Sequence, residues 1–276
     1  MIAEYEIAKL NIRVITDFDI IQSGSSPLFA SSFEKSDVDI RITLGDINVD
    51  DVPVYSDNFV KVFRSKDNFY TVLYYLCENG KIINHFSACG NNCILSRECN
   101  ALSRDMYHFW SMIDLPHILI QHRRLMLHCS YIISNGKAIL FCGKSGIGKS
   151  TQAELWKEFA GAEIINGDKA VIYSENGKLY ASSLPISGTS NICSDKTAEV
   201  EAFVILSQNT QNDIKEINSA ERVSLLASNC LFDVWRDGEM IDVIELCSEF
   251  SQLAKIVKFE CLPDKSAVED LKKVIE

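Results

Sequence analysis

The feature that most constrains this chain is the segment Gly143–Thr151, which reads Gly-Lys-Ser-Gly-Ile-Gly-Lys-Ser-Thr. It matches the Walker A pattern G-x-x-x-x-G-K-S. Residues 137–142, just before it, form a short apolar run typical of a buried strand. Residues 152–159, just after it, place apolar side chains at helical intervals. Strand, glycine-rich loop and helix therefore follow in the order that the motif requires, and a chance match to a turn is the weaker interpretation.

The composition of this segment suits a phosphate chain. Glycines allow backbone conformations in which several N–H groups point into one concavity, and the following helix directs its positive dipole end to the same place. Lys149 would neutralise the terminal phosphates, and the hydroxyl of Ser150 would be a ligand of Mg²⁺. The residues expected to bind a nucleotide are Gly143, Lys144, Ser145, Gly146, Ile147, Gly148, Lys149, Ser150 and Thr151.

The composition argues against several other functions. The chain has 276 residues, of which 47% are hydrophobic and 24% charged, as in ordinary globular proteins of one large or two small domains. A net charge of −11 argues against a nucleic-acid partner, which a basic surface would attract. We find neither a secretory signal nor an apolar run of membrane-spanning length, and the ten Cys follow no disulfide-scaffold spacing. We therefore expect a cytoplasmic protein with free thiols and no membrane partner.

Residues 1–118 are expected to form a small β-rich module with a linking helix. Residues 5–15 and 38–44 alternate apolar and polar side chains, as half-buried strands do. Turn residues between the later apolar runs indicate an antiparallel sheet. The helix is expected over residues 102–114, where apolar side chains recur at helical intervals. A second domain, residues 119–276, would contain the Walker A segment.

Four residues of the first module have the types found in zinc sites: His85, Cys89, Cys93 and Cys99. Their spacing lacks the C-x-x-C pair of the common zinc motifs. Free cysteines packed within strands are therefore the favoured interpretation.

Two further residues extend the candidate site. Asp168 ends the apolar run 162–168 and follows Ser150 by 168 − 150 = 18 residues, a gap that one helix and one strand fill. An acid at the end of a neighbouring strand is the metal ligand that P-loop sites need, so we favour Mg²⁺ binding over a turn cap. His128 lies within the apolar run 125–133, where a buried core histidine is the alternative to a catalytic one.

The run from Leu127-His-Cys-Ser through the Walker A segment to Asn166-Gly-Asp-Lys169 resembles the C-terminal domain of HPr kinase/phosphorylase and the related ATP-dependent phosphoenolpyruvate carboxykinases. The resemblance covers roughly residues 120–270. It implies an α/β fold with a P-loop kinase domain and a mixed sheet, and ATP and Mg²⁺ as cofactors. Members of this family often form oligomers, so a homo-oligomer is a candidate assembly.

The resemblance also implies roles for single residues. Lys149 and Ser150 would bind phosphates and Mg²⁺, Asp168 matches the second Asp of a family pair, and His128 would lie near the transferred phosphoryl group. The candidate catalytic residues are therefore His128, Lys149 and Asp168, and the candidate metal ligands are Ser150 and Asp168.

The chain departs from the family at Gly167, where the pair has its first Asp, the usual base towards the acceptor hydroxyl. That role would pass to Asp168, to His128 or to no residue, and a carboxylate beside Mg²⁺ is a weak base. A family signature segment further along is also absent from the sequence. The chain thus resembles divergent HPr-kinase-like proteins, some of which phosphorylate a Ser in modified-peptide pathways.

Two weaker features follow the candidate site. Residues 182–190 resemble the family's Pro-x-Ser-Gly loop, which suits a passage near the acceptor, with an ordinary connection as the equal alternative. Lys196 is a weaker candidate for reaching the phosphates.

We therefore expect an ATP-dependent serine kinase that transfers phosphate to a hydroxyl of a peptide, a protein or a small-molecule acceptor. The alternative is a regulatory or scaffold protein that binds Mg-ATP without phosphotransfer, because the first acid of the family pair is missing.

Overall fold

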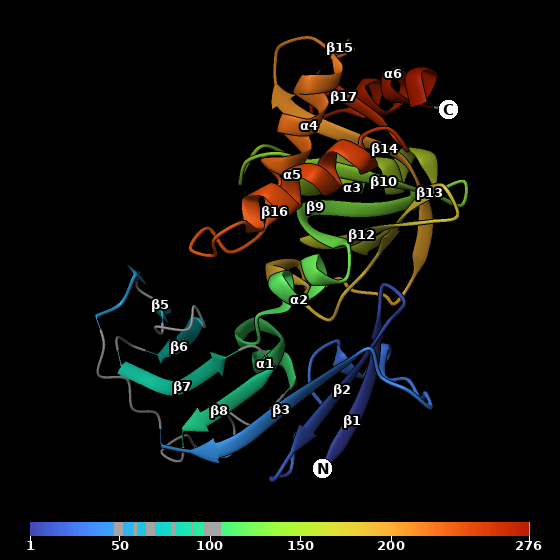
Figure 1. The fold of residues 1–276 in the computed structure, drawn as a ribbon. Coiled ribbons are helices and arrows are strands. Elements are labelled where there is room, and N and C mark those ends of the chain that lie inside the picture. Colours follow the sequence, from blue (N-terminus) through green and yellow to red (C-terminus); the bar gives the residue numbers. More distant parts are fainter. Residues whose placement is uncertain are drawn as a thin grey trace. The chain divides into compact units, whose positions relative to one another are not determined.

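The computed structural model describes residues 1–46, 52–57, 60–64, 70–78, 81–89, 91–96 and 106–275. Within them the chain is a mixed α/β protein with two β-sheets and six α-helices (Figure 1). Two compact units are present: Met1–Leu115 with Val234–Asp237, and Pro116–Asp233 with Gly238–Glu276. The boundary expected from the sequence, between residues 118 and 119, stays a prediction. None of the described helices is long and apolar enough to cross a membrane.

The first unit contains a sheet whose described strands follow the order β1-β2-β3-β8-β7-β6-β5-β4. The strands β2 and β3 pair parallel, as do β3 and β8, whereas the other neighbours pair antiparallel. The expectation of a purely antiparallel sheet is therefore wrong. A long connection between β2 and β3 allows the crossover that parallel pairing requires. The strands are β1 (Ile2–Ile7), β2 (Leu10–Thr16), β3 (Val38–Gly45), β4 (Tyr55–Ser56), β5 (Val60–Arg64), β6 (Tyr70–Glu78), β7 (Lys81–Cys89) and β8 (Asn92–Ser96).

The first two strands form a tight hairpin, whereas the sequence predicted one strand over residues 5–15. Ile7 pairs with Leu10, and the two residues between them, Ala8 and Lys9, have φ angles of 52° and 60°. Such a turn needs left-handed backbone at both positions, and Asn-Gly is its usual signal. Ala-Lys carries no such signal, so alternation alone could not locate the turn.

The helix α1 (Met106–Met112) closes the core of the first unit, and the helix expected over residues 102–114 is confirmed within these bounds. Trp110 is buried, its ring lies edge-on to Tyr5 with 5.0 Å between centroids, and its indole N–H donates to Ser26. Residues 102–105 lie outside the described residues.

The zinc alternative falls largely outside the described residues as well, because Cys99 and the side chains of His85 and Cys89 are not among them. Cys93 is described as a buried free thiol. Among the described residues, no group of three or more His, Cys, Asp or Glu is placed to hold a metal ion.

The second unit contains a sheet in the order β10-β9-β12-β13-β14-β17-β15. A further pairing between β10 and β14 closes five of these strands on themselves, because β9 and β14 are long enough to pair with different partners along their lengths. Two short strands, β11 and β16, also pair with β9. The strands are β9 (Arg124–Ser134), β10 (Lys137–Cys142), β11 (Glu163–Asn166), β12 (Lys169–Glu175), β13 (Lys178–Ser182), β14 (Thr197–Gln208), β15 (Asp213–Lys215), β16 (Cys230–Leu231) and β17 (Lys255–Cys261).

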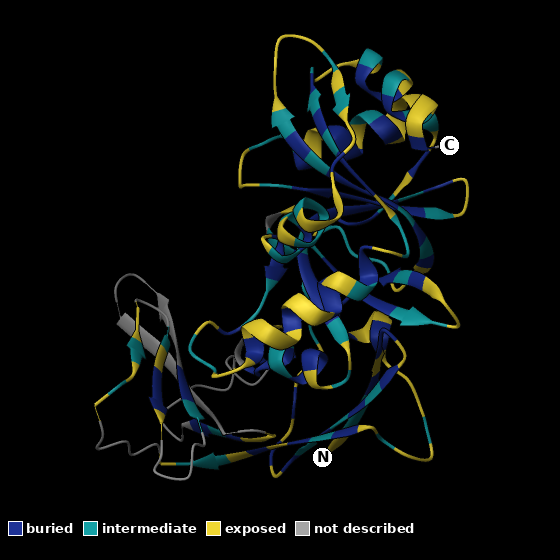
Figure 2. Ribbon diagram, turned by 45° about the horizontal axis from the view of Figure 1, so that its top comes forward, coloured by how far each residue is buried: buried dark blue, intermediate teal, exposed yellow. Residues whose placement is uncertain are grey.

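The parallel strands β10, β14 and β17 consist mostly of buried residues, which Figure 2 colours dark blue. Ile139 and Phe141 belong to one apolar core with Trp156, whereas Leu140 packs in the other with Phe250, as the period of two in a strand dictates. The first core includes residues of α3 (Lys149–Ala160) and α6 (Lys265–Ile275), and the second includes residues of α4 (Ser219–Ala227) and α5 (Glu239–Phe250). The remaining helix is α2 (Leu115–Gln121).

Candidate functional site

The segment between β10 and α3 is a glycine-rich loop with left-handed backbone. Gly146 and Gly148 have φ angles of 77° and 114°, in the region that side chains disfavour. A Cβ atom at either position would meet no protein atom within 4 Å, so crowding by the protein does not explain these glycines. The loop leads directly into α3, which begins at Lys149. Its amides and the positive end of the helix dipole form an anion-binding arrangement.

Lys149 is folded back over this loop. Its ammonium group donates to the backbone oxygens of Gly143 and Lys144, at 2.8 and 3.2 Å, and its residue is only 8% exposed. Burial lowers the pKa of Lys149, an effect that the nearby Cys142, Cys129 and Asp168 oppose. Neutral carbonyl groups hold the ammonium group, and it can exchange them for a stronger anionic partner.

A buried asparagine shapes the acidic corner, residues 166–169, that joins β11 to β12. The side-chain oxygen of Asn166 accepts hydrogen bonds from the backbone N–H groups of Asp168 and Lys169, both at 3.0 Å. Its amide group donates to Ser183 and to the backbone oxygens of Leu184 and Ile186. The exposed fraction of Asn166 is 0%, so these bonds have no competition from water. The corner is therefore fixed before any ligand arrives.

The carboxylate of Asp168 lies between two basic side chains. One oxygen is 3.4 Å from Nδ1 of His128, and the other forms an ion pair with Lys169. The pairing of β9 with β12 causes this arrangement, because His128 lies directly opposite Lys169. Burial lowers the pKa of His128, and the positive charge of Lys149 adds to the shift, against the pull of Asp168. The lowered pKa favours the neutral imidazole, which has a nitrogen able to accept a proton.

A short turn from the following loop packs against this corner. It comprises Gly188–Ser190, and we call it the Ser190 turn. A Cβ atom at Gly188 would lie 2.6 Å from Cγ of Asp168, so only glycine fits there. A Cβ atom at Gly167 would lie 2.3 Å from Oγ of Ser190 and 2.7 Å from its Cβ. The Ser190 side chain thus fills the space that a side chain at residue 167 would need.

The loop, the corner and the turn face one cavity of about 460 Å³. This volume lies within the range of small-molecule sites, roughly 300–1,000 Å³. Three of the predicted loop residues, Gly143, Lys144 and Ile147, line an adjoining cavity of about 600 Å³ that also includes His128. The residues that line the 460 Å³ cavity are His128, Ser145, Gly146, Gly148, Lys149, Ser150, Thr151, Gly167, Asp168 and Ser190.

Another predicted residue lies elsewhere. Lys196 is exposed and binds both carboxylate oxygens of Glu163, at the start of β11, and it does not line the cavity. Conversely, the sequence assigned no role to Asn166 or Lys169, and it indicated Ser190 only as part of the loop 182–190. The Asn-Gly-Asp run does carry a signal, because Asn side chains commonly bond the backbone two residues on.

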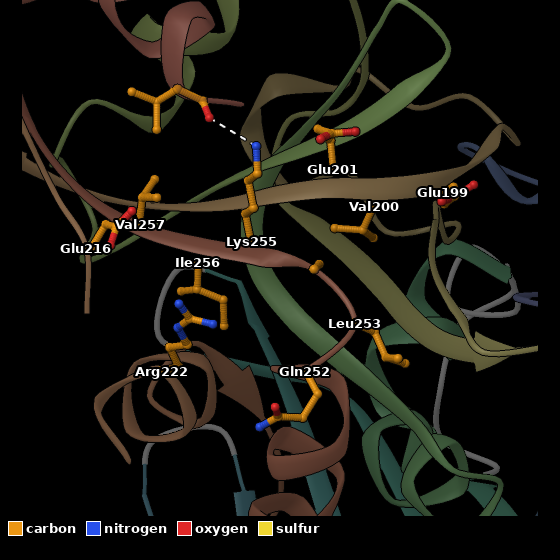
Figure 3. A pocket seen from close by; sticks show the side chains of 12 residues that line it. Glu199, Val200, Glu201, Glu216, Arg222, Gln252, Leu253, Lys255, Ile256 and Val257 are labelled. Carbon is orange, nitrogen blue, oxygen red and sulfur yellow. Dashed lines mark hydrogen bonds between the residues drawn. The ribbon is translucent and has the colours of Figure 1, made fainter. Parts of the chain in front are cut away.

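A separate cavity of about 480 Å³ lies away from this site (Figure 3). It includes Val200 and Val257, near the amino ends of β14 and β17, and its Lys255 donates to the backbone oxygen of Val274 at 3.0 Å. Ligands of parallel sheets bind beyond the carboxyl ends of the strands, where the loop after β10 lies. We therefore place the candidate site at the loop and not in this cavity.

No family model matches the chain. Among solved structures it is similar to the Hpr(Ser) kinase/phosphatase from Coxiella burnetii, with 14% sequence identity and a TM-score of 0.24. The match covers 44% of this chain and 87% of that chain. A similarity of this size carries no argument about function, which must rest on the geometry above.

Proposed function

We propose that this chain is an ATP- and Mg²⁺-dependent kinase that transfers a phosphoryl group to a hydroxyl, with serine of a peptide or protein as the leading acceptor class and a small molecule as the other. One observation carries the proposal. A phosphate-binding loop with its lysine faces the same cavity as an acidic corner on the neighbouring strands.

The residues present fit a magnesium nucleotide. Mg²⁺ usually takes one or two protein oxygens and completes its shell with phosphates and water. Ser150 and Asp168 both line the cavity and offer one hydroxyl and one carboxylate. Glycines at 146 and 148 leave the loop surface free of side chains, so phosphates can approach its amides closely.

Catalysis would rest on positioning and charge neutralisation. When bound, Mg²⁺ would offset charge on the phosphates. Lys149 would leave its two carbonyl partners for the terminal phosphate, and the loop amides would hold the chain in place. His128, neutral and 3.4 Å from Asp168, would accept the proton of the acceptor hydroxyl, so the missing acid at residue 167 need not end transfer.

A second function is Mg-ATP binding without transfer. The observation that favours it is Gly167, which supplies no carboxylate and has no room for one while Ser190 keeps its place. The two functions share the loop and differ only in whether phosphate leaves the nucleotide.

The experiment compares wild-type protein, Lys149→Ala and the matched control Lys157→Ala, which removes an exposed lysine of the same helix. Calorimetry would measure Mg-ATP binding, and mass spectrometry would measure phosphate transfer to a panel of Ser-containing peptides. We expect Lys149→Ala to lower transfer by about 10²-fold or more, as loss of one charge-stabilising donor does, while Lys157→Ala stays near wild type.

Each outcome decides between the functions. Transfer that survives Lys149→Ala would refute the kinase proposal. Lysine-dependent binding with no phosphorylated product across the panel would establish the second function. Absence of Mg-ATP binding in the wild-type protein would refute both.

A further inference from the structure

Ser190 places a hydroxyl of the chain itself in the candidate site. Its residue is exposed and lines the cavity of about 460 Å³ together with residues of the proposed phosphate-binding loop. Its side chain lies next to Gly167, the residue before Asp168, because a Cβ atom on Gly167 would be 2.3 Å from Oγ of Ser190. A serine hydroxyl therefore lies beside the acidic corner, where a kinase of this kind needs its acceptor.

The other hydroxyl groups of the cavity have a different place. Ser145, Ser150 and Thr151 belong to the loop and the first turn of α3, which would surround the phosphates. Among the described residues that line the cavity, Ser190 is the one that bears a hydroxyl and lies outside the loop and α3. It is therefore the hydroxyl of this chain that could serve as an acceptor of the terminal phosphate.

The hydroxyl is also free to turn. Ser190 Oγ donates to the backbone oxygen of Ser187 at 2.9 Å and accepts a long bond of 3.3 Å from the N–H of Ile192. Both partners belong to the same loop, so rotation of the exposed serine side chain breaks only local bonds.

We propose that Ser190 accepts the terminal phosphoryl group of the nucleotide bound in its own chain. This inference rests on the proposed kinase function. Oγ of Ser190 forms a bond to the terminal phosphorus, and the bond from that phosphorus to the bridging oxygen breaks. ADP leaves with the electron pair of that bond. The hydroxyl proton passes to a water molecule of the solvent.

The product would change the electrostatics of the site. Phosphoserine carries a charge of about −1.5 to −2 at pH 7. At residue 190 this charge would lie in the cavity that Asp168 and Lys149 also line. It would occupy the place of an incoming terminal phosphate, so the phosphorylated protein should bind Mg-ATP more weakly. The reaction would thus switch off its own site.

The experiment incubates the full-length protein with Mg-ATP labelled in the terminal phosphate and maps the label by peptide mass spectrometry. The variants are Ser190→Ala, Ser190→Thr, Lys149→Ala and the matched control Ser194→Ala in the same loop. Mg-ATP affinity is measured for each by calorimetry. We expect one phosphate on residue 190 in wild type, in Ser194→Ala and in Ser190→Thr, and none in Ser190→Ala or Lys149→Ala. The first-order rate constant should not depend on protein concentration.

The outcomes separate this inference from the proposed function. If Mg-ATP binds and external peptides are phosphorylated while residue 190 stays unlabelled, the inference is refuted and the kinase function stands. Label that persists in Ser190→Ala, or a rate that rises with protein concentration, would also overturn it. If wild type does not bind Mg-ATP, the inference fails together with the function on which it rests.

Discussion

The contact between residues 167 and 190 makes a quantitative prediction. Gly167 has no positive φ angle, so its backbone accepts an alanine without strain. The only atoms that oppose a Cβ there belong to Ser190, at 2.3 Å from Oγ and 2.7 Å from Cβ. Both distances are far below ordinary contact, so Gly167→Ala must displace the Ser190 turn. The loss of unfolding free energy in this variant should therefore depend on the side chain of Ser190 alone.

The size of that cost follows from two opposing terms. Forcing one extra carbon into a packed site costs about 1–3 kcal/mol, and replacing glycine with alanine restricts the unfolded chain and returns about 0.4–1 kcal/mol. We expect Gly167→Ala to lower the unfolding free energy of the second unit by about 1–2 kcal/mol. Ser190→Ala removes the atom at 2.3 Å but keeps the one at 2.7 Å, whereas Ser190→Gly removes both. Ser190→Ala should therefore remove part of the destabilisation caused by Gly167→Ala, and Ser190→Gly should remove all of it.

The assay is a double-mutant cycle in urea. Global unfolding of two units need not be two-state, so amide hydrogen exchange in β9 and β12 would report the second unit by itself. The amide of Cys129, which donates to the backbone oxygen of Asp168, is a probe within the corner. In the Ser190→Gly background, Gly167→Ala should cost nothing or add a little stability, which gives a coupling energy of about 1–3 kcal/mol.

Two results would refute the reasoning. If Gly167→Ala has the same unfolding free energy as wild type, the Ser190 turn can move aside without loss of stability. Equal destabilisation by Gly167→Ala in the wild-type, Ser190→Ala and Ser190→Gly backgrounds would mean that another contact opposes the new side chain.

Two further predictions concern charge. Burial and the charge of Lys149 lower the pKa of His128 in the folded protein, so below pH 6.5, the ordinary pKa of histidine, the unfolded chain binds a proton more readily than the folded chain does. The contribution of His128 to the free energy of unfolding should therefore be complete above pH 6.5. It should decrease as the pH drops from 6.5 to the lower pKa of the folded state. His128→Gln should flatten the urea-unfolding profile across that range, and an unchanged slope would contradict the assignment. In the first unit, Arg236 forms an ion pair with Asp114, whose side chain is 3% exposed, and Arg236→Ala should cost about 3–5 kcal/mol because it leaves a buried charge. The control Arg123→Ala breaks an exposed pair and should cost at most about 1 kcal/mol; equal losses in urea unfolding would show that burial does not set the difference.

Much of the second unit could be predicted from local patterns. The Asn135-Gly136 turn, the strand 137–142 and the helix after the Walker A segment all have strong short-range signals, and the structure contains each of them. The later helices α4, α5 and α6 have clear apolar periodicity in the sequence. Residues 198–206 and 254–261 are rich in apolar side chains, as strands are, and they lie in β14 and β17.

The contacts between distant segments could not be predicted in the same way. The pairing of β10 with β14 joins strands that are far apart in the sequence, and no local residue pattern encodes it. The role of Asn166 is another case, because its partners at 183, 184 and 186 come from a loop that follows two more strands. Local sequence located the acid of the corner, whereas tertiary packing decides what holds that acid in place.

Gly167 shows why the two kinds of information must be used together. By sequence resemblance alone, a missing acid at this position indicates lost activity. In space, the loss coincides with a serine whose side chain occupies the vacated volume. Restoring the acid by Gly167→Asp alone would therefore test packing as much as chemistry, because the new carboxylate must first displace Ser190. The informative variant is Gly167→Asp combined with Ser190→Gly, in which a change in phosphate transfer reports the added base and no longer the collision.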